Sequence, residues 1–231
     1  MARVALFDLD RTLIDVNSGS LWLRHEMRQG RVRWRDAAWA SWWFTRYHLG
    51  LGGGLDDAFA EAVRNYRHMK TEDLSAASHD FFQNQVRSRL RPGAARALQK
   101  HRDNGDRIAL ASSTTQYLAE QASKAWNMEL AAYTTLEVVD GELTGEITAL
   151  ALGEHKTSRA LEWAEAQGID LSTAAFYTDS FTDLDLMERV GEPVAINPDR
   201  RLRRAALQRG WRVEDWGHSA AGQQADEPEI V

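Results

Sequence analysis

Four short runs of apolar residues recur along the chain, and each stops at a polar or acidic residue. The runs are Val4–Phe7, Ile108–Ala111, Ala174–Tyr177 and Pro193–Ile196. An unbroken apolar run of this length is typical of a strand that is buried on both faces of a parallel sheet. Segments with helical patterning lie between the runs, at residues 94–102, 116–126, 156–167 and 183–190. This alternation predicts an α/β fold built on a doubly wound parallel sheet.

Residues 16–90 break this alternation because they contain no strand-like run. Their composition is helical, and we expect helices at residues 20–29, 33–49, 55–69 and 71–89. Gly50–Gly54, with four glycines in five residues, predicts a turn between two of these helices. We therefore interpret residues 16–90 as a helical cap, inserted into a core that residues 1–15 and 91–216 form.

Two further segments depart from the strand and helix pattern. Residues 133–147 surround Asp140-Gly141, a pair that is typical of a tight hairpin turn, so they predict a β-hairpin. Residues 217–231 are rich in small and polar residues, and we expect them to form a disordered tail.

The composition indicates which classes of binding partner and which cellular compartment fit the protein. The chain has 231 residues, a formal net charge of −6 and no cysteine. An acidic balance makes nucleic acid an unsuitable main partner. The lack of cysteine excludes disulfides, thiolate metal sites and a cysteine nucleophile, and it fits a reducing compartment, so we expect a cytoplasmic protein. No stretch reaches the roughly 18 apolar residues of a membrane span, so we expect a soluble chain.

Polar side chains follow the predicted strands, which is where an open parallel sheet places its ligand site. They are Asp8 and Asp10 after the first strand, Ser112 and Ser113 after the second, Asp179 and Asp183 after the third, and Lys156 at the start of a helix in the same layer. Carboxylates gathered at one edge repel each other, and a divalent cation would offset their charge. A donor set of oxygens without cysteine favours Mg²⁺ over zinc.

These groups suit the chemistry of a phosphate ester. A hard cation beside hydroxyl and ammonium donors stabilises phosphoryl oxygens. Asp8 would attack phosphorus to form an aspartyl phosphate. Asp10 would protonate the leaving oxygen and later deprotonate water. Ser112 has a second interpretation as the N-cap of the following helix, and Ser113 shares both possibilities.

The same residues resemble the four motifs of haloacid dehalogenase superfamily phosphatases, in the order that this family has them. The motifs are Asp8-Leu-Asp10-Arg-Thr12 after an apolar strand, Ser112 closing a strand, Lys156 at a helix start, and Asp179 with Asp183 four residues later. The resemblance spans residues 4 to about 215. It implies a Rossmann-like core with an inserted cap.

The resemblance also implies a role for each motif residue. Asp8 would be the nucleophile and Asp10 the general acid and base. Mg²⁺ would be held by Asp8, the backbone carbonyl of Asp10 and Asp179, with Asp183 in support. Ser112 and Lys156 would bind the transferred phosphoryl group.

The position of the insertion and residues 137–145 resemble the phosphoserine phosphatase-like branch of this family, subfamily IB, whose helical cap closes over the site. Members that act on phosphoserine usually carry a Glu nine residues after the nucleophile, and that position is Asn17 here. Related members act on other small monoesters such as histidinol phosphate, so the resemblance leaves the ester open. The branch also has a cap Arg that binds substrate, for which Arg64 and Arg67 are candidates.

We predict a Mg²⁺-dependent phosphatase that acts on a small phosphate monoester. A phosphotransferase or mutase would use the same residues with a second hydroxyl in place of water. A phosphoacceptor domain that does not hydrolyse its substrate is a further alternative, but it predicts a chain about half as long, without a cap insertion.

An aromatic stripe in the expected cap is not explained by the predicted phosphatase chemistry. Trp39, Trp43 and Tyr47 recur at four-residue spacing, which places them on one face of a helix. We expect this face to pack inside the cap or to form a homodimer contact, with binding to a membrane surface as the alternative.

Overall fold

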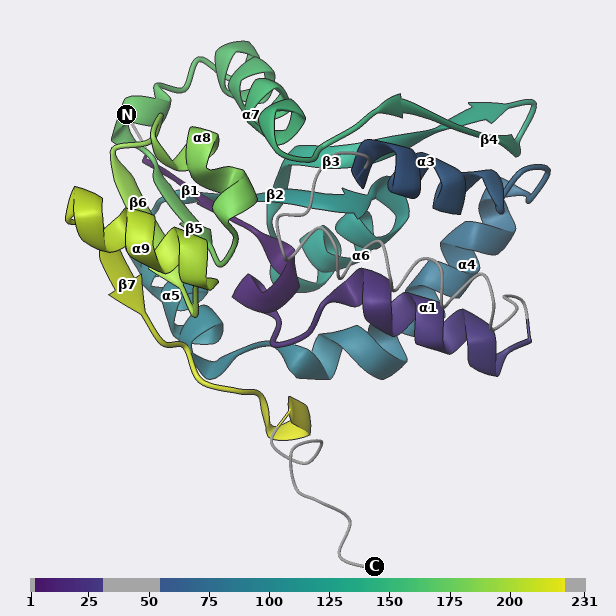
Figure 1. Cartoon of the computed structure of the whole chain (residues 1–231), viewed down its shortest axis with the longest axis horizontal. Coiled ribbons are helices and arrows are strands. Elements are labelled where there is room, and N and C mark those ends of the chain that lie inside the picture. Colours follow the sequence, from purple (N-terminus) through teal and green to yellow (C-terminus); the bar gives the residue numbers. More distant parts are fainter. Residues whose placement is uncertain (1–2, 31–54, 223–231) are drawn as a thin grey trace, which may run out of the picture.

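The computed structural model of the protein describes residues 3–30 and 55–222. In these residues one sheet has seven strands in the order β4-β3-β2-β1-β5-β6-β7 (Figure 1). The strands are β1 (Val4–Phe7), β2 (Arg107–Thr115), β3 (Glu129–Val139), β4 (Glu142–Ala149), β5 (Ala175–Thr178), β6 (Glu192–Ile196) and β7 (Arg212–Glu214). Neighbouring strands are parallel except for β3 and β4, which form an antiparallel hairpin.

Helices flank the sheet on both faces. In the described part of the chain they are α1 (Ser18–Arg28), α3 (Leu55–Arg64), α4 (Thr71–Phe81), α5 (Pro92–Asp103), α6 (Gln116–Trp126), α7 (Glu154–Ala166), α8 (Leu184–Met187) and α9 (Arg200–Arg209). Figure 1 shows α1, α3 and α4 gathered to one side of the sheet, beside the β3–β4 hairpin. The predicted doubly wound α/β fold is confirmed.

The central strand explains why its sequence is apolar throughout. Ala5 and Phe7 belong to the core under α5 and α6, whereas Val4 and Leu6 belong to the core under α7, α8 and α9. Because both faces are covered, every side chain of the strand is buried, as a parallel sheet requires.

The register of β1 places the candidate site. Phe7 pairs with Leu110 of β2 and with Tyr177 of β5. Parallel pairing in this register brings the carboxyl ends of β1 and β5, and the part of β2 beyond Leu110, to one edge of the sheet. The residues that follow Phe7, Leu110 and Tyr177 are therefore brought together there.

Several elements have other bounds than the sequence predicted. Strand β2 runs on to Thr115, so Ser112 and Ser113 lie within it. Strand β3 begins at Glu129 and pairs with β2 before it turns into the predicted hairpin. Asp140 and Gly141, with φ of 50° and 80°, form the turn. Strand β7 was not predicted from the sequence.

The predicted helices of the inserted segment also differ in part. The helix expected at residues 71–89 ends at Phe81, and a π-helical turn (Phe82–Val86) and a 3₁₀ turn (Arg87–Arg89) follow it. Phe81, Phe82 and Val86 are fully buried in the core beside Trp126, so packing has overridden the regular helical period there. The helix expected at residues 33–49, the glycine turn and the aromatic stripe lie outside the described residues.

Residues 217–222 lie against the core, whereas we expected a disordered tail from residue 217. The Ser219 N–H donates to Asp15 Oδ2 at 2.7 Å, and Ser219 is buried. The remainder of the expected tail, 223–231, lies outside the described residues. No helix in the described ranges has the length and apolar character that crossing a membrane requires.

Candidate active site

Asp8 stands at the end of the central strand, where the chain makes a sharp turn. Its N–H donates to the Tyr177 carbonyl at 2.9 Å, which continues the pairing of β1 with β5. The turn after it holds Arg11 in the left-handed region, at φ 56°. The Arg11 N–H donates to the Val16 carbonyl at 3.0 Å, and the Arg11 carbonyl accepts from Arg91 Nε at 3.2 Å. These bonds fix the loop that carries Asp8 and Asp10.

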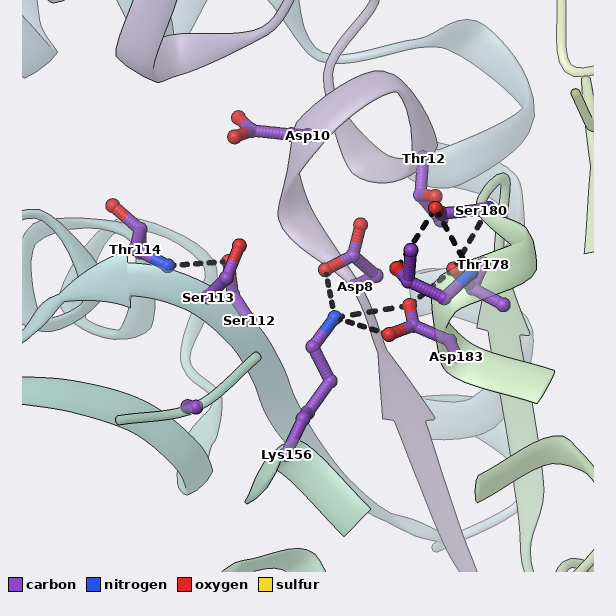
Figure 2. Close-up of polar contacts among 12 residues, drawn as sticks. Asp8, Asp10, Thr12, Ser112, Ser113, Thr114, Lys156, Thr178, Ser180 and Asp183 are labelled. Atoms are coloured by element: carbon purple, nitrogen blue, oxygen red, sulfur yellow. Dashed lines mark hydrogen bonds and ion pairs between the residues drawn. The ribbon is translucent and has the colours of Figure 1, made fainter. Parts of the chain in front are cut away.

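Lys156 joins two carboxylates at the centre of the site. Its Nζ lies 3.0 Å from Asp8 Oδ1 and 2.8 Å from Asp183 Oδ1. Thr178 Oγ1 donates to Asp183 Oδ2 at 2.6 Å. Figure 2 shows Lys156 reaching up between Asp8 and Asp183. The first turn of α7 and the loop after β5 therefore meet at the end of β1.

Burial disfavours the ionised carboxylates of the site more than one ammonium can offset. Burial raises the pKa of Asp8 to about 7, Lys156 opposes the shift, and Asp183 and Asp10 add to it. Burial likewise raises the pKa of Asp179 well above its usual range, and Asp8 and Asp183 add to that shift. Burial alone would lower the pKa of Lys156, but Asp183 and Asp8 outweigh it and raise the pKa. Lys156 is therefore charged.

The donor set suits a hard divalent cation. Asp8, Asp179 and Asp183 are all buried, and Lys156 is the one cation that their hydrogen bonds and ion pairs reach among the described residues. The surplus of negative charge on oxygen donors matches the preference of Mg²⁺. No group of three or more His, Cys, Asp or Glu in the described ranges could hold a metal by itself. The set that the resemblance implies includes a backbone carbonyl and does not depend on such a group.

Asp10 lies apart from this cluster and contacts the start of α1. The Ser18 N–H donates to Asp10 Oδ1 at 2.8 Å, and Asn17 Nδ2 lies 3.4 Å from Asp10 Oδ2. The Asn17 Oδ1 also caps α1 by accepting the Ser20 N–H at 2.8 Å. Burial raises the pKa of Asp10, with the Ser18 bonds opposing. In Figure 2 its carboxylate points away from Lys156 and Asp183.

Ser112 and Ser113 lie at the same edge of the sheet, on the other side of Asp8 from Asp183 (Figure 2). Ser112 is buried, and its Oγ lies 3.3 Å from the Thr114 N–H. Helix α6 begins at Gln116, with Thr115 as its N-cap residue. The interpretation of Ser112 as a helix N-cap is therefore wrong.

The two candidate arginines of the inserted segment lie outside this cluster. The Arg64 guanidinium is exposed and pairs with Glu61 at 2.7 Å. Arg67 Nε donates to the Thr144 carbonyl of the hairpin at 2.9 Å. The structure thus brings Asp8, Asp10, Ser112, Ser113, Lys156, Asp179 and Asp183 to one edge of the sheet, but not Arg64.

Two contributors to the site were missed by reasoning from the sequence. Thr178 holds Asp183, and its only signal is that it directly precedes Asp179. Arg91 is buried and supports the loop after Asp8 from a position that is 80 residues away in the sequence. No local pattern marks such a residue, because its contact depends on the tertiary fold.

Comparisons with known proteins agree with this geometry. The family model described as haloacid dehalogenase-like hydrolase matches residues 5–188. A histidinol-phosphatase of Neisseria meningitidis serogroup C is 31% identical over 92% of this chain and 98% of that protein. The inhibition of morphological differentiation protein of Streptomyces azureus is 31% identical over 92% of this chain and 78% of that protein. A crystal structure of a Bordetella pertussis Tohama I protein of unknown function is 30% identical, with a TM-score of 0.82 over 94% of this chain and 100% of that one.

Proposed function

Because the chain belongs to the haloacid dehalogenase-like hydrolase family, we propose that it hydrolyses a small phosphate monoester through an aspartyl phosphate on Asp8. The observation that carries this proposal is the buried Asp8–Lys156–Asp183 cluster at the end of β1, with Asp10 two residues from Asp8 but turned away from the cluster. A nucleophile and a separately held acid are what the two steps of such a hydrolysis need.

In the first step an Asp8 carboxylate oxygen bonds to phosphorus while the ester oxygen leaves. Asp10 gives its proton to that oxygen, and its raised pKa favours the protonated form that this requires. In the second step water attacks phosphorus, Asp10 takes the water proton, and the bond from phosphorus to Asp8 breaks. Lys156 and Ser112 hold the phosphoryl oxygens as charge develops on them.

We propose Mg²⁺ as the cofactor, held by Asp8, the Asp10 backbone carbonyl and Asp179, with Asp183 in support. When bound, the cation offsets the charge of the carboxylates and of the phosphoryl oxygens. Thr12 Oγ1 lies 3.4 Å from Asp179 Oδ1 and orients that carboxylate. Without Thr12, Asp179 would be less well fixed for this task.

We also propose that residues 16–90 act as a cap over the site. Asn17 and Ser18 at the start of α1 already contact Asp10. Helix α3 packs with the β3–β4 hairpin in a small apolar cluster of its own, around Val63, Leu136 and Leu143. This cluster joins residues 16–90 to the hairpin of the core, and the contacts of Asn17 and Ser18 place the start of the insertion beside Asp10, as a cap that limits access to the site requires.

Position 17 carries no charged partner for an ammonium group beside the phosphate of the ester. The Asn17 side chain is neutral, and its oxygen is occupied by the cap of α1. It therefore offers no ion pair to the amino group of phosphoserine. Histidinol phosphate and phosphoserine both carry this amino group, so position 17 does not distinguish between them. Histidinol phosphate is the first ester to test because a relative at 31% identity is named for it.

Proposals for the location and assembly of the protein follow from the same sequence. We place the protein in the cytoplasm, since a chain without cysteine fits a reducing compartment. We propose a homodimer through the aromatic stripe of Trp39, Trp43 and Tyr47, which light scattering of the wild type and a triple alanine variant would test.

Release of inorganic phosphate from a panel of monoesters tests the proposed function. The panel includes histidinol phosphate, phosphoserine and a nucleoside monophosphate, each with Mg²⁺ or EDTA. We expect turnover with Mg²⁺ that EDTA abolishes and that Asp8→Asn lacks. Transfer of phosphate to an added alcohol at the expense of release would identify a phosphotransferase. A folded protein that binds Mg²⁺ and turns over no ester would overturn the proposal.

A further inference from the structure

Helix α9 carries none of the predicted site residues, yet its first turn contacts the loop that carries two of them. We call residues 179–183 the Asp179 loop. The Asp199 N–H donates to the Asp179 carbonyl at 2.9 Å. Asp199 Oδ2 accepts the Phe181 N–H at 2.8 Å. The loop is therefore bonded to Asp199 at two points, by main chain and by side chain.

The second oxygen of the same carboxylate caps α9. Asp199 Oδ1 accepts the N–H groups of Arg201 and Leu202, both at 2.8 Å. Leu202 is fully buried in the core under α7 and α8, so α9 is firmly seated. One side chain thus fastens the Asp179 loop to a helix that the core holds in place.

Arg201 adds a contact from the same turn of α9. Its guanidinium carbon lies 4.1 Å from the centre of the Phe181 ring, a cation–π distance. The sequence alone indicates a solvated cationic face over residues 200–204. The structure gives Arg201 a specific partner instead, on the loop between Asp179 and Asp183.

We propose that Asp199 is a positioning residue for the reaction, which fixes the Asp179 loop so that Asp179 and Asp183 keep their places around Asp8 and Lys156. This inference rests on the proposed function, because it assumes that Asp179 and Asp183 serve the metal site. Asp199 touches neither of these carboxylate groups. It acts through the main chain that carries them, as residues behind a metal ligand commonly do.

The two oxygens of Asp199 allow its two tasks to be separated. Ser is a good N-cap residue but has one short hydroxyl, so Asp199→Ser keeps the cap of α9 and loses the bond to Phe181. Arg201→Ala removes the cation from the Phe181 ring and leaves Asp199 intact. Arg204→Ala on the exposed side of the same helix is the matched control.

Four measurements on the full chain test the proposal: melting temperature, steady-state kinetics, Mg²⁺ affinity and amide hydrogen exchange. We expect Asp199→Ser to melt near the wild-type temperature. Its kcat should fall by about 10- to 100-fold, with KM little changed. Its Mg²⁺ affinity, measured by calorimetry without substrate, should fall by a similar factor. Amide hydrogen exchange should rise over residues 180–183 and stay slow in α9. Arg201→Ala should change kcat in the same direction by a smaller factor, and Arg204→Ala should match the wild type.

Other outcomes distinguish failure of the positioning role of Asp199 from failure of the proposed function. Wild-type kcat, Mg²⁺ affinity and exchange in Asp199→Ser would overturn the proposal. So would an activity loss that only follows the fraction of unfolded protein, because Asp199 would then be a helix cap alone. If the wild type hydrolyses no ester, the proposed function fails, but the Mg²⁺ affinity and exchange of the two proteins still decide whether Asp199 positions the loop.

Discussion

Lys156 is the single side chain on which the charge of the site depends. Its ammonium lies within ion-pair distance of Asp8 and Asp183, and all three side chains are almost fully buried. In water such pairs contribute little, but burial weakens the screening and makes an unpaired charge costly. The same ammonium lies beside the atom that would receive the phosphoryl group, so it would contribute both to the stability of the folded protein and to catalysis.

Replacing Lys156 should therefore damage activity more than folding. We expect Lys156→Met to lower kcat by about 10²- to 10³-fold, because a donor to the phosphoryl oxygens is lost while the carboxylates take up protons to limit the charge. Phosphate release at saturating ester measures the effect. Lys124→Met, at an exposed Lys on α6, is the control and should keep wild-type activity. Equal kcat in both variants would contradict the role given to Lys156.

The sequence identifies the acids of the site because each follows a strand directly, and strand ends converge in a parallel sheet. The same logic finds Ser112, whereas Lys156 is found by its place at a helix start in the order of the four motifs. This logic misses Arg91, and it reveals nothing of the Asp199 contacts, since these residues act on loops far from them in the sequence. It also does not predict that the Asp10 carboxylate turns away from the cluster, because that direction depends on the turn after β1 and on the contacts of Asp10 with Asn17 and Ser18.

At the scale of elements, the sequence predicts the bounds of a strand best where the burial of the strand is the same along its whole length. Strand β1 has the predicted bounds because both of its faces are buried along its whole length. Strand β3 was missed at its start because it changes partner, from parallel β2 to antiparallel β4, and so changes its burial pattern along its length. The edge strand β7 has three residues, too few for a pattern.

Helices α5 and α1 each have a glycine as their second residue, but we expect replacement by alanine to change stability in opposite directions at the two positions. Gly93 is the second residue of α5, and an added Cβ would lie 2.3 Å from Trp216 Cγ, too close to be accommodated. Gly19 is the second residue of α1, and an added Cβ would meet only Asn17 Oδ1 at 3.4 Å. We expect Gly93→Ala to reduce the free energy of unfolding by about 1–3 kcal/mol and Gly19→Ala to leave it unchanged or raise it by up to about 1 kcal/mol.

Urea unfolding of the two variants and the wild type measures this difference. The reduction in Gly93→Ala arises because Trp216 packs on Phe7 and Tyr177 and has no room to retreat. Equal stability of the two variants would show that the C-terminal segment yields easily, against the packing described here.

At the scale of the whole molecule, the buried carboxylates make stability depend on pH. The ordinary pKa of an Asp is 3.8, whereas that of Asp8 in the folded protein is about 7. Between these values the folded protein keeps a proton that the unfolded chain has released. The contribution of Asp8 to stability is therefore complete below the lower value and is lost as the pH rises through the upper one. Asp10 and Asp179, with raised pKa values, act in the same direction.

We expect the metal-free protein to lose about 1 kcal/mol of stability per pH unit from Asp8 alone as the pH rises toward 7, or about 2–4 °C in Tm, and Asp10 and Asp179 add to this loss. Thermal unfolding in EDTA across this pH range measures the slope. Asp8→Asn should reduce the slope, and saturating Mg²⁺ should remove most of it because the cation favours the ionised carboxylates. A metal-free Tm that rises with pH over this range would contradict the electrostatics of the site.

Trapping the aspartyl phosphate intermediate tests whether Asp8 carries the phosphoryl group during turnover. A radiolabelled ester from the panel is mixed with the enzyme and Mg²⁺, quenched in acid, and the labelled peptide is identified by mass spectrometry. We expect label on Asp8 in the wild type and none in Asp8→Asn. In Asp10→Asn the label should both form and disappear more slowly, because Asp10 serves both steps. Turnover of the ester with no label on Asp8 in either the wild type or Asp10→Asn would contradict this role of Asp8.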